Sequence, residues 1–155
     1  VAVAEPVPGD TEHAATLAAA GPRAQEFVGL AAQHGLEVEF VSDKVGDATA
    51  RVLLRSILIR GVSAAIVDTL WAAKALKHDA WAYQEILRTF ESLSPETARG
   101  MLRDTVKNVK PRQIEMMNVS EMLGETEYVS TMSGGIALTY SRLLHSTKVP
   151  FSHAP

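Results

Sequence analysis

Gly46-Asp47-Ala48-Thr49-Ala50-Arg51-Val52-Leu53-Leu54-Arg55-Ser56 is the stretch of sequence that decides the fold. Small residues open it and apolar residues follow at helical spacing, which predicts the start of a long helix. We expect this helix to run from about Asp47 to Lys77. Because its apolar residues occur nearly all round the helix, we expect other elements or a second subunit to cover several of its sides.

The residues before this helix alternate in the manner of a β-α-β unit. Val1–Val3 predicts a strand that stops before Pro6, since proline cannot donate to a strand ladder. Residues 14–20 predict a weak second strand, and residues 22–35 a helix that starts at a proline and ends at a glycine. Residues 36–41 alternate with period two, which is typical of a half-buried strand.

After the long helix the pattern predicts four further helices and no convincing strand. Asp79 is the expected N-cap of the first, and Ser94-Pro95-Glu96 opens the second with a cap residue, a proline and an acid. The third is expected over residues 111–123 and the fourth over residues 128–144. The predicted class is therefore α+β: a β-α-β segment in residues 1–45, an all-α domain in residues 46–147 around a long central helix, and a frayed tail in residues 148–155.

Composition indicates an ordinary water-exposed globular chain. It has 155 residues, of which 46% are hydrophobic and 21% charged, and a formal net charge of -3. Lysines and arginines are scattered among the acids, so no basic stripe indicates nucleic-acid binding. The first residues have no signal-peptide pattern, and four ionisable residues interrupt the most apolar stretch, residues 52–76. We therefore expect a cytoplasmic protein with neither a nucleic-acid partner nor a membrane span.

The sequence lacks the residues or motifs that disulfides, metal sites and dinucleotide-binding sites require. There is no cysteine, so disulfides and thiolate ligands are excluded. The five histidines are dispersed and form no metal-ligand pair, and we expect no metal site. No Gly-x-Gly-x-x-Gly follows a predicted strand, so this chain alone is expected to bind no dinucleotide.

Two segments nevertheless indicate a ligand site. Residues 5–10 lie where the first strand leaves its sheet, a place where ligands collect in open α/β folds, although the pattern alone favours a plain surface turn. Arg55 and Ser56 stand among apolar neighbours on the long helix. An arginine there needs either a carboxylate of the protein or an anionic ligand, and the pattern alone slightly favours the internal salt bridge.

The chain also resembles a known family along nearly its whole length. The run from Gly46 looks like that family's Gly-Ala-Ala-Ser-Ala-Leu-Lys-Met-Leu-Arg-Ser followed by Lys-Gly, and residues 6–9 look like its Pro-Val-Ser-Gly loop. The matching residues are Gly46, Ala48, Ala50, Leu54, Arg55, Ser56, Gly61, Arg112, Glu115, Met116, Glu121 and Leu123. The family is the 6-phosphogluconate and β-hydroxyacid dehydrogenase superfamily, in its branch of phosphogluconate-dehydrogenase-like NAD-binding proteins.

This resemblance implies the carboxy-terminal part of a two-domain NAD(P)-dependent oxidoreductase. A Rossmann-like domain, of which residues 1–45 would be the end, binds NAD or NADP, and the helical domain forms a homodimer. A small hydroxy or keto acid lies between the domains. The resemblance implies substrate contacts from Gly9, Arg55, Ser56 and Arg112, and a cofactor held by an amino-terminal portion that this sequence lacks.

One position departs from the family. Its catalytic lysine, a proton donor and acceptor, aligns with Val52, which cannot transfer a proton, and Arg51 points about 100° away on a helix. The resemblance therefore implies no catalytic residue in this chain. A second hypothesis stays open beside the dehydrogenase: a non-catalytic helical dimerisation module from a truncated or degenerate dehydrogenase gene.

Overall fold

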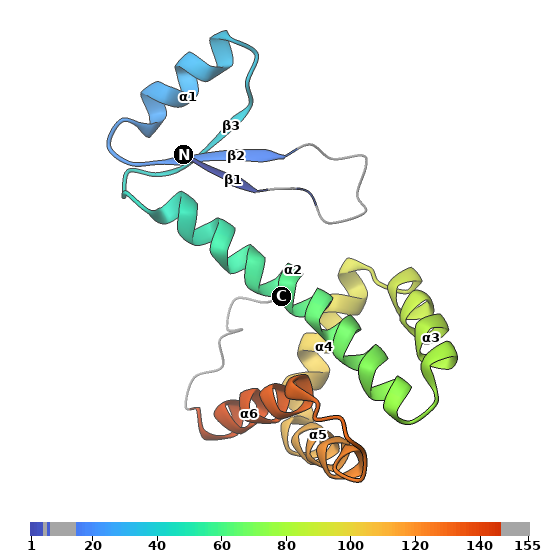
Figure 1. Cartoon of the computed structure of the whole chain (residues 1–155). Coiled ribbons are helices and arrows are strands. Elements are labelled where there is room, and N and C mark those ends of the chain that lie inside the picture. The colour runs from blue at the N-terminus through green and yellow to red at the C-terminus, as the bar shows by residue number, and fades with distance from the viewer. Residues whose placement is uncertain (5, 7–14, 147–155) are drawn as a thin grey trace. The chain divides into compact units, whose positions relative to one another are not determined.

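The first unit of the chain, Val1–Ser63, holds a three-stranded sheet, one short helix and the beginning of a long one (Figure 1). The second unit, Ala64–Pro155, is helical in its described part. The structure, a computed structural model, describes residues 1–4, 6 and 15–146. These residues form an α+β fold, as the sequence predicted.

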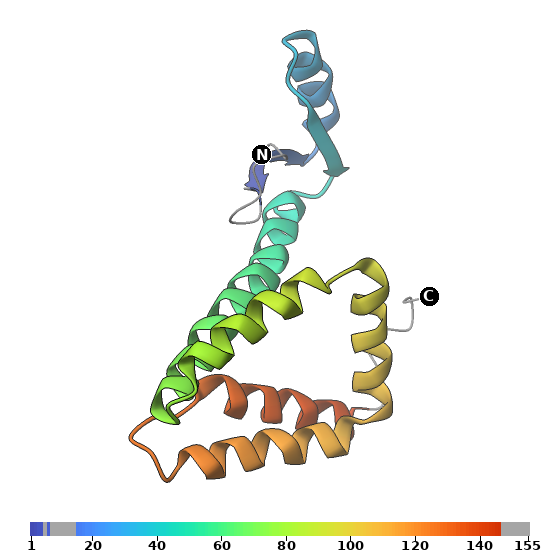
Figure 2. The same cartoon turned by 90° about the vertical axis from the view of Figure 1, so that its right-hand side faces the viewer.

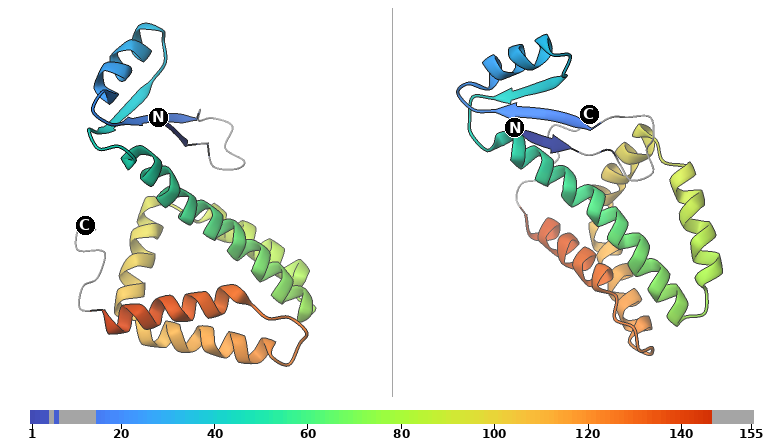
Figure 3. Two further views of the ribbon diagram at one scale, coloured as in Figure 1. Left: turned by 60° about the vertical axis from the view of Figure 1, so that its left-hand side comes forward. Right: turned by 45° about the horizontal axis from the view of Figure 1, so that its top comes forward.

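The sheet contains β1 (Ala2–Ala4), β2 (Thr16–Ala20) and β3 (Val38–Ser42), in that order. β1 is antiparallel to β2, whereas β2 is parallel to β3. The helix α1 (Ala24–Gln33) connects the two parallel strands and packs against both, as the right-hand view of Figure 3 shows. β2, α1 and β3 therefore form the β-α-β unit that the alternating pattern predicted.

Small side chains let this unit pack closely. Ala19 on β2 and Ala24 and Ala31 on α1 are buried, with Ala19 only 1% exposed. Gly21 ends β2 in a left-handed conformation, with φ of +131°, and its N–H donates a 2.9 Å hydrogen bond to the carbonyl oxygen of Ser42. Glycine suits this turn because other residues rarely adopt that φ.

The long helix α2 spans Asp47–Ala75 and begins where the sequence predicted. Gly46, with φ of +97°, turns the chain into it. The hydroxyl of Ser42, at the end of β3, donates a 2.7 Å hydrogen bond to the Asp47 carboxylate. This bond fixes the first turn of α2 at the edge of the sheet, which positions the helix face described below.

Four more helices follow in the second unit, as predicted. They are α3 (Asp79–Glu91), α4 (Pro95–Lys107), α5 (Val109–Leu123) and α6 (Thr131–His145). α5 and α6 pack side by side, which Figure 2 shows clearly, and Leu123 at the end of α5 is fully buried. None of the helices in the part of the chain that the structure describes is long and apolar enough to cross a membrane.

Two predicted helix starts were wrong. Asp79 is the first residue of α3 and not its cap; His78 holds the N-cap position and makes no capping hydrogen bond. α6 begins three residues later than predicted, because the Ser130 hydroxyl accepts a 3.0 Å hydrogen bond from the N–H of Ser133 and so caps the helix there. The predicted cap of α4 is confirmed: the Ser94 hydroxyl accepts from the N–H of Thr97 at 3.1 Å.

Asp68 ties the carboxy-terminal half of α2 to the residues that precede α6. Its two carboxylate oxygens accept hydrogen bonds from the Tyr128 hydroxyl at 2.7 Å and the Ser130 hydroxyl at 2.5 Å. Partial burial raises the pKa of Asp68, but hydrogen bonds from Ser130, from Tyr128 and from the backbone N–H groups of Met132 and Thr131 outweigh it and hold that pKa below its ordinary value. Asp68 is therefore a charged anchor for the start of α6.

Candidate functional site

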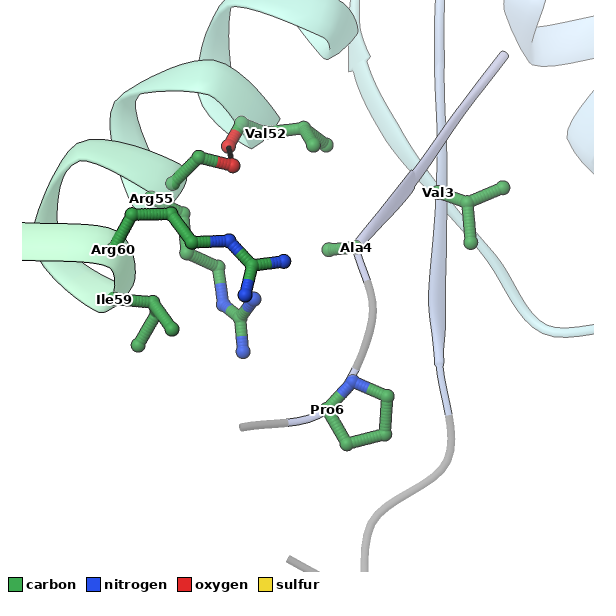
Figure 4. A pocket seen from close by; sticks show the side chains of 8 residues that line it. Val3, Ala4, Pro6, Val52, Arg55, Ile59 and Arg60 are labelled. Carbon is green, nitrogen blue, oxygen red and sulfur yellow. Dashed lines mark hydrogen bonds between the residues drawn. The ribbon is translucent and has the colours of Figure 1, made fainter. Parts of the chain in front are cut away.

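A cavity of about 240 Å³ lies in the first unit, beside the amino-terminal half of α2 and the end of β1. The residues that line it are Val3, Ala4, Pro6, Val52, Arg55, Ser56, Ile59 and Arg60. On α2 these residues fall at helical intervals of three or four, which places them along one side of the helix. Hydrogen-bonding side chains thus converge with a strand end on one small hollow (Figure 4).

The most informative feature of the cavity is its pair of arginines. In Figure 4 the guanidinium groups of Arg55 and Arg60 both extend from α2 toward Ala4 and Pro6. Among the described residues neither arginine has a hydrogen bond or an ion pair, and none of the described lining residues is acidic. The internal salt bridge that the pattern slightly favoured for Arg55 is therefore not formed within residues 1–4, 6 and 15–146.

Several other described arginines pair with acids. Arg51 lies 2.7 Å from a Glu39 carboxylate oxygen. Further pairs with acids three residues away in sequence involve Arg23, Arg88 and Arg99. Exposed pairs of this kind contribute little stability, yet they cancel the charge locally. In the cavity, by contrast, the positive charges of Arg55 and Arg60 have no acidic partner among the described residues.

Ser56 contributes a hydroxyl that is already engaged. It donates a 3.0 Å hydrogen bond to the carbonyl oxygen of Val52, one turn earlier, which the dashed line in Figure 4 marks. In this rotamer the hydroxyl can only accept from a ligand, because its single proton is used. A rotation about the Cβ–Oγ bond would redirect that proton toward an anion in the cavity.

Val52 lies in the same cavity, whereas Arg51 does not. Val52 is one of the lining residues, and Arg51 instead pairs with Glu39 on β3. This divergence agrees with the turn of about 100° per residue in an α-helix. The arginine next to the expected lysine position is thus directed elsewhere, and the cavity wall at that position is apolar.

The two remaining predicted site residues lie elsewhere. Gly9 is outside the described residues. Arg112 belongs to the second unit, where its guanidinium lies 3.0 Å from an Asp104 oxygen and 2.9 Å from a Glu115 oxygen. Hydrogen bonds from Asn108 and Arg112 lower the pKa of Asp104, as expected for a carboxylate in such a network. A substrate contact by Arg112 stays a prediction, and it would require an anion to compete with two carboxylates.

Sequence reasoning missed Arg60 as a site residue. It lies four residues after Ser56, so helical spacing alone could have assigned it to the same side. Its offset of five residues from Arg55, however, corresponds to about 140° around the helix, which does not suggest that the two arginines line the same cavity. Only the length of the arginine side chain lets both guanidinium groups reach one cavity. Elsewhere in the described chain, no three His, Asp or Glu side chains lie close enough together to hold a metal ion.

Comparison with known proteins gives one limited likeness. No protein-family model matches the chain, and no curated protein matches it. A crystal structure of a conserved hypothetical protein from Sinorhizobium meliloti 1021 is similar, with 25% sequence identity and a TM-score of 0.45 over 90% of this chain and 46% of that one. This chain therefore spans about half the length of that protein.

Proposed function

We propose that the chain is the carboxy-terminal part of an NAD(P)-dependent, cytoplasmic oxidoreductase of the β-hydroxyacid dehydrogenase type. In this proposal the cavity beside α2 holds the anionic group of a small hydroxy or keto acid. One observation carries it: Arg55 and Ser56, to which the sequence resemblance assigns substrate contacts, line one cavity together. The β2–α1–β3 unit is consistent with the end of a Rossmann-like domain.

The roles of the two residues follow from their chemistry. Arg55 is permanently charged and offers a planar fork of N–H donors that matches a carboxylate. Ser56 is a hydrogen-bonding neighbour that can accept from a substrate hydroxyl while it donates to Val52. Together they recognise a carboxylate next to a hydroxyl, which is the defining pattern of a hydroxy acid.

The chain's own residues do not fit a dinucleotide. The sequence has no glycine-rich fingerprint after a strand, so the backbone N–H groups that cradle a pyrophosphate have no counterpart here. NAD(P), which would supply or accept the hydride, would thus be held by an amino-terminal portion. What this chain supplies is the anion site and an apolar wall at Val52.

α2 also offers a surface for a second copy. Four apolar side chains of its amino-terminal half are strongly exposed, from 61% to 71%: Leu53, Leu54, Ile57 and Leu58. Water-exposed apolar patches of this kind mark interaction surfaces. None of these four residues lines the cavity, so a homodimer formed through them would not use the cavity's own side chains.

A turnover assay tests the proposal. The chain, joined to its amino-terminal portion in one polypeptide, is supplied with NADH or NADPH and a panel of 2- and 3-keto acids. We expect substrate-dependent oxidation of the cofactor, lost on Arg55→Gln and retained in the matched variant Arg51→Gln. No turnover together with no substrate-dependent thermal shift would refute the proposal.

One observation favours a second candidate, the non-catalytic dimerisation module. Val52 cannot donate a proton, and loss of a general acid typically slows a reaction by about 10²–10⁴-fold. If this candidate is correct, the full polypeptide dimerises through α2 but binds no keto acid. Thermal unfolding with and without pyruvate and 2-hydroxybutyrate separates the two candidates, because only the dehydrogenase is stabilised by a ligand of its folded state.

A further inference from the structure

We propose that the cavity beside α2 takes a ligand group with two negative charges, and that Arg60 is the residue that sets this preference. The inference rests on the proposed function, because it concerns the same anion site. The inference goes beyond the proposed function, since a hydroxy acid with a single carboxylate needs only Arg55. The dianion could be one phosphoryl group or two neighbouring carboxylates, and the experiment below distinguishes them.

The charge of the cavity is the first argument. Arginine is protonated at every accessible pH, so Arg55 and Arg60 bring two positive charges to one hollow. Neither has an acidic partner among residues 1–4, 6 and 15–146. A single carboxylate would cancel one of these charges and leave the other uncompensated. A dianion cancels both.

The rest of the lining strengthens this requirement. Val3, Ala4, Val52 and Ile59 are apolar and solvate a charge poorly. Arg55 is half-buried and Arg60 exposed, so water screens part, but not all, of the repulsion between the two guanidinium groups. The ligand that relieves that repulsion most completely is therefore favoured.

The size of the cavity limits the ligand. Its volume of about 240 Å³ is smaller than the roughly 300–1,000 Å³ of typical small-molecule pockets. It suits a compact charged group more than an extended molecule. In Figure 4 the guanidinium groups reach into the same space from successive turns of α2, so one compact group can contact both.

Titration calorimetry on the 155-residue chain tests the inference, at constant ionic strength so that screening does not change between ligands. The probes are acetate, inorganic phosphate and malonate. We expect phosphate or malonate to bind at least about 10-fold more tightly than acetate, as one added charge-assisted hydrogen bond predicts. Tighter phosphate binding assigns a phosphoryl group, and tighter malonate binding assigns a dicarboxylate.

Variants separate the two arginines. Arg60→Gln should weaken binding of the preferred dianion by about 10- to 100-fold and of acetate by less than about 3-fold. Arg60→Lys keeps the charge and should keep the preference, which guards against a folding defect in the glutamine variant. Arg51→Gln, which removes a charge that Glu39 already neutralises, is the matched control and should change neither ligand's affinity.

The outcomes also separate this inference from the proposed function. Equal affinity for acetate and the dianions, or a dianion affinity that Arg60→Gln leaves unchanged, overturns the inference. If Arg55→Gln still abolishes acetate binding in that case, the proposed anion site stands. If no anion responds to either arginine, both the inference and the proposed site fail.

Discussion

The Nη1 atom of Arg51 lies 2.7 Å from the Oε1 atom of Glu39, so the charge of Arg51 is directed to β3. Its neighbour Val52 lines the cavity beside α2. These two adjacent positions therefore have different relationships to the candidate site. A side chain at position 52 reaches the cavity, whereas one at position 51 does not.

This difference predicts the effect of restoring a lysine. If the proposed function is correct, Val52→Lys in a polypeptide that carries the proposed amino-terminal portion should raise the rate of keto-acid reduction by about 10²-fold or more, because it adds a proton donor inside the cavity. The matched variant Arg51→Lys places a lysine one residue away and should have no such effect. NADPH oxidation measures both rates, and equal rates for the two variants would contradict the prediction.

The acid anchor at Asp68 predicts how stability depends on pH. Since hydrogen bonds hold the folded-state pKa of Asp68 below its ordinary value, its contribution is present above the unfolded-state pKa. That contribution should be lost as the pH falls from the unfolded-state pKa of about 4 through the lower folded-state pKa and Asp68 becomes protonated. Asp68→Asn should cost about 1–2 kcal/mol at pH 7 and flatten the acid limb of the stability profile.

Chemical denaturation at a series of pH values measures this effect. Asp43→Asn is the control, because Asp43 is an exposed acid in the loop after β3. An Asp68→Asn protein that loses stability in acid as steeply as wild type would show that this carboxylate is not responsible.

The same anchor predicts a change in tyrosine ionisation. Burial, and then the hydrogen bond to Asp68 and its negative charge, raise the pKa of Tyr128 above its ordinary value. Asp68→Asn removes the charge, so Tyr128 should ionise at lower pH in the variant than in wild type. Ultraviolet absorbance of the phenolate during an alkaline titration, with Tyr128→Phe to identify the signal, reports the shift. A Tyr128 signal at the same pH in both proteins would be evidence against this coupling.

The cap of α4 predicts a moderate loss of stability. The Ser94 hydroxyl accepts the N–H of Thr97, and Ser94→Ala removes that acceptor. The expected cost is about 1 kcal/mol, or about 2–4 °C in Tm for a chain of this size. Ser94→Asp retains an acceptor at the cap and should unfold near the wild-type temperature. If both variants unfold together, the hydroxyl has no capping role.

The exposed patch on α2 predicts how the chain associates. Ile57, which is 71% exposed, should become buried when two copies meet. Ile57→Asp would then bury a charge without a partner and should weaken dimerisation by at least about 100-fold. Thr49→Asp adds the same charge near the start of α2 and serves as the control. Analytical ultracentrifugation measures the association, and a wild-type protein that stays monomeric at high concentration would exclude the dimer.

Much of the fold could be predicted because local signals agree with it. The Ser94-Pro95 start of α4 and the start of α2 at Asp47 rest on signals within a few residues, and both are confirmed. The start of α6 was misplaced although its cap is local, since the Ser130 hydroxyl accepts from an N–H only three residues later. What the sequence could not show is that this hydroxyl also binds Asp68, more than sixty residues earlier. Such a contact is invisible in a local pattern.

Part of the candidate site could likewise be predicted from the sequence, and part could not. The position of Arg55 and Ser56 among apolar neighbours and the family resemblance both predict them as site residues. Arg60 was missed, although it lies one turn after Ser56, because its five-residue offset from Arg55 is not a usual helical spacing. The contribution of β1 also required the tertiary structure, since Ala4 and α2 are far apart in sequence.

The location of a bound anion tests the central claim most directly. A crystal of the chain grown or soaked with selenate, a tetrahedral dianion, reveals selenium by its anomalous scattering. We predict a selenium peak in the cavity beside α2, within hydrogen-bonding reach of the Arg55 and Arg60 guanidinium groups, and its loss in Arg55→Gln crystals. Selenate bound elsewhere on the chain while this cavity stays empty would contradict the account.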